Sequence, residues 1–346
     1  MKKFILLFLI SLPLILIGCG ISNISNPFSS GQNSHANVNV YVGTQGMSAE
    51  FSKTAPPPTV LQDSNFPILI KLKNSGAYGI TEKKGLMSIG IEKDYAKIIS
   101  LDGNPSLGEF NLNKIPFEIA GKSPSNPKGD EIYISLNAKT GKLDPQSETH
   151  TSTITATLCY PYQTMASATV CIDPDPSGIR PGKKVCTAKD MTFGSGQGAP
   201  IAVTRIESQM VPGDNNNIYP QFLIYVENRG GGDSVNPSNY RSACTQSDGV
   251  KTDVWNLAYI NVYTSTGNGE TQLSCCPNSQ NNCGKDAGDK TGKLKFKDKK
   301  DFVRCTFRDS IPKNYDAYTS PLKIVIDYGY VQSVAANFDI KKPLKY

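Results

Sequence analysis

Short apolar segments with polar residues at alternate positions recur along the chain and predict β-strands. Residues 131–136 and 152–158 alternate with period two, and residues 66–74 form an apolar, β-branched run. Clusters of Gly, Pro and Asn separate these segments, and no amphipathic segment of three helical turns stands out beyond the N-terminal region. The pattern predicts an all-β fold built from antiparallel β-sandwiches.

The second part of the chain repeats the pattern of the first. Both copies contain an aliphatic strand that ends in Asn-x-Gly, then a second strand, and later a Tyr-x-Tyr segment. The matched pairs are 68–76 with 222–230, 86–91 with 257–262, and 159–162 with 327–330. The same order with a drifting offset predicts a tandem duplication in which the second copy carries loop insertions.

Two stretches rich in Gly and Pro, 173–178 and 194–200, lie between the copies. They predict a first domain at 37–176, a linker at 177–198, and a second domain at 199–346. The insertions then fall within the second domain.

The N-terminal segment has a different pattern. Lys2 and Lys3 precede an apolar run of fourteen residues, which is too short to span about 30 Å of hydrocarbon but suits a signal peptide. The run ends in Leu-Ile-Gly-Cys at 16–19, which resembles the lipobox of prokaryotic lipoproteins. This resemblance implies that residues 1–18 are a signal peptide and that Cys19 carries thioether-linked lipid, which would anchor the chain to a membrane.

Residues 19–36 lack any hydrophobic period and predict a lipidated flexible tether. An N-glycosylation sequon begins at Asn23 within it. Each aliphatic strand ending in Asn-x-Gly resembles the early strand of immunoglobulin-like surface domains of the CARDB kind, and Gly43 to Gly46 is similar to a segment of exported archaeal surface proteins. The resemblance implies two immunoglobulin-like sandwiches that act as spacers or adhesive modules, and it names no ligand.

Composition narrows the function classes. Charged residues make up 19% of the 346 residues and hydrophobic residues 38%, which excludes a charged disordered tail and a membrane bundle. The two histidines disfavour most zinc enzymes and Ser-His-Asp or Cys-His catalysts. A net charge of +6 is weak over this length, and the basic stretch 293–300 predicts an edge strand with a lysine face, so no nucleic-acid partner is expected.

Nine cysteines leave an odd residue, which the lipobox assigns to Cys19. In an oxidising exterior the other eight can form four disulfides, with 105 connectivities. These eight are Cys159, Cys171, Cys186, Cys244, Cys275, Cys276, Cys283 and Cys305. They concentrate where the second copy departs from the first, which predicts a cross-linked surface.

One pairing has a geometric argument. A hairpin with its turn near Met165 would place Cys159 opposite Cys171, within disulfide distance. The same register in the second copy would oppose Asp327 and Asp339, and facing like charges argue against it. With that pair formed, Cys186 is expected to tie the linker to the second domain.

Metal sites are not predicted. The run Asp-Pro-Asp-Pro-Ser-Gly at 173–178 begins like a calcium loop, but the twelfth position holds Lys184 where a calcium loop has Glu, and the two prolines favour a rigid linker. Cys275 and Cys276 lack the spacing of a zinc site. No cofactor is expected. The two Tyr-x-Tyr segments predict core packing.

These patterns predict a lipid-anchored, extracytoplasmic protein of the cell envelope. Its expected role is non-catalytic: structural, adhesive or protein-binding, with other envelope proteins or surface glycans as partners. The first alternative is a carbohydrate-binding module, for which Trp255 and Tyr259 are the candidate ligand contacts. The second is a secreted hydrolase with an unrecognised acidic site.

Overall fold

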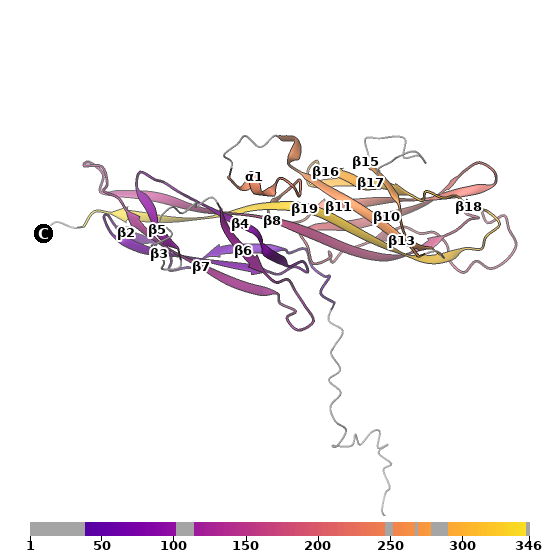
Figure 1. The fold of residues 1–346 in the computed structure, drawn as a ribbon, viewed down its shortest axis with the longest axis horizontal. Coiled ribbons are helices and arrows are strands. Elements are labelled where there is room, and N and C mark those ends of the chain that lie inside the picture. The colour runs from indigo at the N-terminus through magenta and orange to yellow at the C-terminus, as the bar shows by residue number, and fades with distance from the viewer. Residues whose placement is uncertain (1–38, 102–113, 246–251, 267–268, 278–289, 344–346) are drawn as a thin grey trace, which may run out of the picture. The chain divides into compact units, whose positions relative to one another are not determined.

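The computed structural model describes residues 39–101, 114–245, 252–266, 269–277 and 290–343. Cys19, Asn23 and the predicted signal peptide lie outside these residues. Val38–Tyr346 form one compact unit that is almost entirely β-structure with antiparallel sheets, as predicted (Figure 1). In the described part, helix is confined to α1 (Tyr240–Thr245) and a 3-10 turn, η1 (Thr252–Val254).

A nine-stranded central sheet runs through the whole unit. Its main path is, in spatial order, β14 (Gly269–Gln272), β13 (Leu257–Thr266), β19 (Tyr318–Lys341), β8 (Thr149–Ile172), β4 (Ile80–Ile91) and β6 (Ile115–Ile119). Three shorter strands attach to this path: β12 (Asp233–Val235) and β2 (Thr59–Leu61) pair with β19, and β16 (Gly292–Lys295) pairs with β13.

Two outer sheets complete the fold. The first outer sheet has the order β1 (Met47–Phe51), β3 (Asn65–Asn74), β7 (Asp130–Thr140) and β5 (Ala96–Leu101). The second outer sheet has the order β15 (Ser274–Pro277), β17 (Lys300–Thr306), β11 (Asn217–Asn228), β10 (Ile201–Pro212) and β9 (Met191–Thr192), with β18 (Ile311–Pro312) paired to β11.

Both outer sheets cover the same face of the central sheet. Alternate residues of β3 point inward, and Ile68 and Ile70 on this strand are fully buried. Phe66 of β3 contacts Phe338 of β19 with ring centroids 4.9 Å apart. The buried residues of both halves form one hydrophobic cluster, so the core is continuous from one half to the other.

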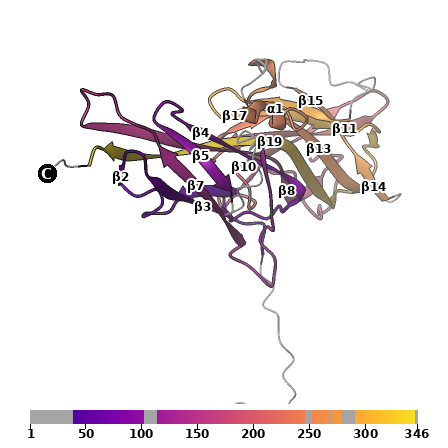
Figure 2. The ribbon, with the colours of Figure 1, turned by 60° about the vertical axis from the view of Figure 1, so that its left-hand side comes forward.

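The two longest strands, β8 and β19, pair antiparallel along 24 residues each (Figures 1 and 2). Pro161 lies opposite Gly329, its own counterpart under the 168-residue offset of the repeat. A local two-fold relation therefore passes through this pair, and each long strand belongs to both halves. The packing is continuous across the predicted domain boundary, and both halves belong to one compact unit. The boundary therefore remains a prediction of where the two copies of the repeat divide.

The predicted hairpin with its turn near Met165 is wrong. Met165 lies inside β8 opposite Val325, and the inside-outside alternation continues on both sides of it. The segment lacks Gly, Asn, Asp or Pro at the supposed turn, so nothing stops the strand there. Asp327 and Asp339 do not lie opposite each other, because they pair with Gln163 and Thr151.

The two Asn-x-Gly turns share three hydrogen bonds, which recur in both halves. The Oδ1 atom of Asn74 accepts the N–H of Gly76 at 3.1 Å and the hydroxyl of Tyr162 at 3.1 Å. Asn228 receives the same two bonds from Gly230 and Tyr330. Both asparagine amides also donate to the carbonyl four residues on. These matched contacts support the duplication, while the immunoglobulin-like assignment stays a prediction.

Candidate functional site

Three disulfides are present in the described part, and none has the pairing expected from sequence. They are Cys159–Cys244, Cys171–Cys186 and Cys275–Cys305. Cys276 is also disulfide-bonded, and Cys283 lies outside the described residues. The expected Cys159–Cys171 bond is wrong because both residues lie on one continuous strand, twelve positions or about 40 Å apart. Cys186 does not pair with a cysteine of the second copy, as expected; it bonds Cys171 at the end of β8.

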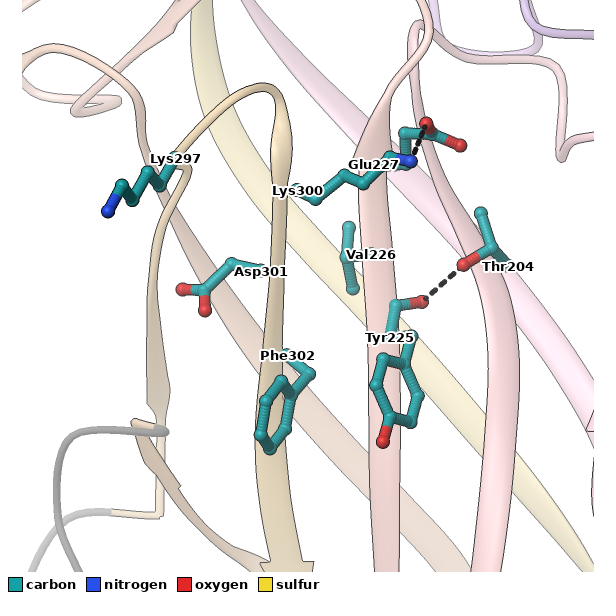
Figure 3. Close-up of a pocket in the computed structure, with 8 residues that line it drawn as sticks. All are labelled: Thr204, Tyr225, Val226, Glu227, Lys297, Lys300, Asp301 and Phe302. Atoms are coloured by element: carbon teal, nitrogen blue, oxygen red, sulfur yellow. Dashed lines mark hydrogen bonds and ion pairs between the residues drawn. The ribbon is translucent and has the colours of Figure 1, made fainter.

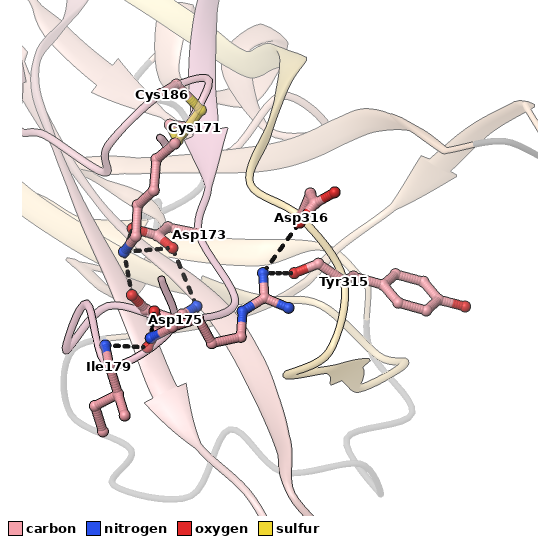
Figure 4. A network of polar contacts seen from close by, with 9 residues as sticks. Cys171, Asp173, Asp175, Ile179, Cys186, Tyr315 and Asp316 are labelled. Atoms are coloured by element: carbon pink, nitrogen blue, oxygen red, sulfur yellow. Dashed lines mark hydrogen bonds and ion pairs between the residues drawn. A yellow bond between two sulfur atoms is a disulfide. The ribbon is translucent and has the colours of Figure 1, made fainter. Parts of the chain in front are cut away.

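The Cys171–Cys186 bond closes a loop over the Asp-Pro-Asp-Pro segment, here named the stapled loop (residues 171–186). Inside it, Lys184 Nζ lies 2.8 and 3.1 Å from the two carboxylate oxygens of Asp173 and also bonds the carbonyl oxygen of Asp175 (Figure 4). The Asp173 side chain is only 5% exposed. The lysine ammonium therefore supplies the positive charge that a calcium ion would bring to such a loop.

Backbone amides complete the fixation of the stapled loop. The Asp175 carboxylate accepts the N–H groups of Ile179 at 3.1 Å and Arg180 at 3.0 Å. These two bonds lower the pKa of Asp175, and the bond from the Arg180 N–H has the larger effect. The Arg180 guanidinium bonds the carbonyl of Tyr315 at 2.7 Å and the carboxylate of Asp316 at 3.2 Å. The loop is thus joined to the segment that leads into β19.

Two aliphatic side chains of the stapled loop point into solvent. Ile179 is 83% exposed and Val185 is 79% exposed, the two highest values among the large hydrophobic residues of the described part. Tyr315, whose backbone the loop bonds, is 56% exposed. A loop with fixed backbone that exposes apolar side chains is suited to contact another surface.

A second feature is a pocket of about 360 Å³ on the second outer sheet, lined by Thr204, Tyr225, Val226, Glu227, Lys297, Lys300, Asp301 and Phe302 (Figure 3). Tyr225 of β11 and Phe302 of β17 are directly opposed, with ring centroids 5.0 Å apart and planes inclined by 30°. The Arg205 guanidinium lies 5.6 Å from the centre of the Tyr225 ring. The disulfide Cys275–Cys305 joins β17 to β15.

The two carboxylates of this pocket have different environments. Arg229 Nε at 3.0 Å and Lys300 Nζ at 3.4 Å lower the pKa of Glu227, Arg229 more strongly. Burial raises the pKa of Asp301, whose Oδ2 accepts the N–H of Lys295 at 2.7 Å. The pleat directs the two side chains to opposite sides of the sheet, and Figure 3 shows them pointing apart. They do not face each other as a catalytic pair would.

The candidate ligand contacts Trp255 and Tyr259 do not form an exposed aromatic strip. Trp255 is half-buried and packs against a small cluster around α1 on the face of the central sheet opposite the outer sheets. The hydroxyl of Tyr259, also half-buried, accepts a bond from Asn236 Nδ2 at 3.3 Å. Four tyrosines of the Tyr-x-Tyr segments are buried, as predicted: Tyr160, Tyr162, Tyr328 and Tyr330.

Sequence analysis missed the pocket and the role of Lys184. A usable signal for the pocket was present: in Phe-Leu-Ile-Tyr-Val-Glu at 222–227, the period of two puts Tyr225 and Glu227 on the face opposite Phe222. In the sequence, Lys184 stands out only because it occupies the position where a calcium loop has Glu. Its position as the internal cation requires the loop closure that the disulfide provides.

Within the described residues, no group of three or more His, Cys, Asp or Glu side chains is placed to hold a metal ion. No helix among those residues has the length and hydropathy of a membrane span. The chain matches no protein-family model and no curated protein.

Proposed function

We propose that this chain is a lipid-anchored protein of the cell envelope with a non-catalytic, protein-binding role, and that the stapled loop is its contact with a neighbouring envelope protein. The observation that carries the proposal is the exposure of Ile179 and Val185 on a loop fixed by a disulfide and an internal ion pair. A loop that is already ordered loses little conformational freedom on binding, so buried apolar area contributes more fully to affinity.

The envelope location rests on two independent features. The Leu-Ile-Gly-Cys segment at 16–19 directs lipid to Cys19, and disulfides of this number persist in oxidising compartments outside the cytosol. The continuous ladder of β8 and β19 supports a mechanical role, because the two halves cannot rotate about a linker as separate domains would.

Two experiments test the proposal. Cys19→Ser should shift the protein from the membrane fraction to the medium, and retention on membranes would refute the anchor. A photo-crosslinking residue at position 179 or 185, in the full chain on intact cells, should give a discrete adduct with another protein. The same probe at Tyr133, which is 55% exposed in the first outer sheet, is the matched control. Equal labelling from position 133, or no adduct at 179 and 185, would refute the docking role.

A further inference from the structure

The pocket on the second outer sheet has the features of a site for a small polar ring. Its volume of about 360 Å³ lies within the range of small-molecule sites, about 300–1,000 Å³. Tyr225 and Phe302, from two neighbouring strands, stack on each other and form one apolar wall of the pocket. Hydroxyl, carboxylate and ammonium groups line the rest of the pocket.

Local backbone features shape this pocket. The register of β10 against β11 shifts between Val203 and Arg205, so Thr204 is the extra residue of a β-bulge, and it lines the pocket. Bulges redirect side chains and are common beside binding sites. On the other side, Asp298 and Lys299 have positive φ values of 50° and 64°, and their tight turn holds the two lining lysines at its ends.

The carboxylate on the ring side of the pocket is already paired. Glu227 bonds Arg229 and Lys300, and the Asp301 carboxylate points to the other side of the sheet, so the ring side holds paired charges and not a single unpaired carboxylate. Paired charged groups still offer lone pairs and N–H groups that can bond a neutral ligand rich in hydroxyls.

The aromatic pair of the pocket belongs to the second copy. Under the 154-residue offset of the strands, Tyr225 corresponds to Lys71 of β3, which lies opposite Tyr133 of β7. There the Lys71 ammonium lies 6.0 Å from the Tyr133 ring centre and 3.0 Å from the Glu131 carboxylate. A cation thus takes the place of the second aromatic ring, and the first copy lacks the aromatic pair.

From these observations we propose that the pocket binds a neutral carbohydrate, with the apolar C–H groups of a hexose ring packed against the wall formed by Tyr225 and Phe302 and its hydroxyls bonded to Thr204 and Glu227. This site is separate from the stapled loop and goes beyond the protein-binding role proposed above. It would let the chain hold a surface glycan and a neighbouring protein by different faces.

Affinity electrophoresis tests this proposal with the full-length chain in non-ionic detergent. Native gels containing mannan, dextran or galactan should retard the wild-type protein, and gels containing the anionic polymer alginate should not. Phe302→Ala and Tyr225→Ala should weaken the retardation at least about tenfold, the effect of losing one stacked ring. Tyr225→Phe keeps the ring and should retain binding, and Tyr133→Ala is the matched control on the first outer sheet.

Several outcomes would overturn the glycan site: no retardation by any neutral polymer, retardation by alginate alone, or equal retardation of wild type and ring variants. The disulfide pattern and thermal midpoint of each variant report on folding. If a ring variant does not fold, Glu227→Gln and Thr204→Val probe the polar side of the same pocket. Photo-crosslinking from position 179 should be unchanged by Phe302→Ala, so failure of this proposal is distinguishable from failure of the docking role.

Discussion

Lys184 is expected to keep the stapled loop closed, and Lys184→Met tests this directly. The substitution keeps the length of the side chain but leaves the Asp173 carboxylate, 5% exposed, without its cation. Breaking a buried ion pair costs about 3–5 kcal/mol, whereas exposed pairs contribute about 0–1 kcal/mol. Because Lys184 is 25% exposed, we expect an intermediate cost of about 1–2 kcal/mol for keeping the loop closed.

Hydrogen exchange measures this cost locally. The amides of Ile179 and Arg180 donate to Asp175, so their exchange reports loop opening. A loss of 1–2 kcal/mol should speed their exchange about 5- to 30-fold. The double variant Asp173→Asn with Lys184→Met should recover much of the loss, because no buried charge is left unpaired. Lys183→Met, at the exposed neighbouring lysine, should have no effect.

The reasoning fails if Lys184→Met leaves exchange unchanged, or if the double variant opens as readily as the single one. It also fails if calcium or a chelator changes exchange in the wild-type protein, because the ammonium already supplies the cation. These outcomes separate an ion-pair clamp from a loop that is closed by its disulfide alone.

Three further predictions concern the stability of the fold. Removing the Cys159–Cys244 disulfide should lower the free energy of unfolding more than removing Cys171–Cys186, because the sequence separations are 85 and 15 residues. The chain-entropy relation gives losses of about 4.6 and about 3 kcal/mol. Urea unfolding of variants with both cysteines of a pair replaced by serine measures them. Tyr162→Phe should lower the free energy of unfolding by about 0.5–1.5 kcal/mol, and Tyr330→Phe should cost more, because the Tyr330 hydroxyl also accepts the N–H of Gly232 at 3.0 Å; an equal or smaller loss at Tyr330 would contradict this. Asp301→Asn should raise the thermal midpoint at neutral pH but not at acidic pH. Burial raises the folded-state pKa of Asp301, so the favourable contribution of its protonated form is present below the unfolded pKa and is lost as the pH rises through the folded pKa. An equal rise of the midpoint at both pH values would contradict this.

The strands and the repeat could be predicted from sequence because alternation and the Asn-x-Gly turns are local signals. The segments 68–76 and 222–230 lie on β3 and β11 and have matching contacts. The pairing of β8 with β19 could not be predicted in this way. Local periodicity shows that a segment is a strand, but it does not show which distant strand it pairs with. A hairpin was therefore expected where one strand of 24 residues continues.

For the candidate sites too, local features could be predicted from the sequence and tertiary pairing could not. The cysteines were recognisable, but their partners depend on tertiary pairing, and the error in the hairpin carried over to Cys159 and Cys171. Trp255, a predicted ligand contact, packs beside α1. Tyr225 and Phe302 are 77 positions apart in the sequence, so only the β11–β17 register brings them together.

The insertion of the second copy reinforces the joining of the two halves by β8 and β19. Gly329, at the centre of the local two-fold relation, has no room for a side chain: an added Cβ would lie 2.6 Å from Tyr240 of α1 and 2.7 Å from Val235 of β12. The same insertion reaches the first copy, where the Tyr240 hydroxyl bonds the carbonyl of Lys84 at 2.9 Å and Cys244 is joined to Cys159. A segment that breaks the symmetry of the repeat thus covers its centre and cross-links it. The cysteines of the second copy therefore do more than hold its own loops; one of them fastens the two copies together.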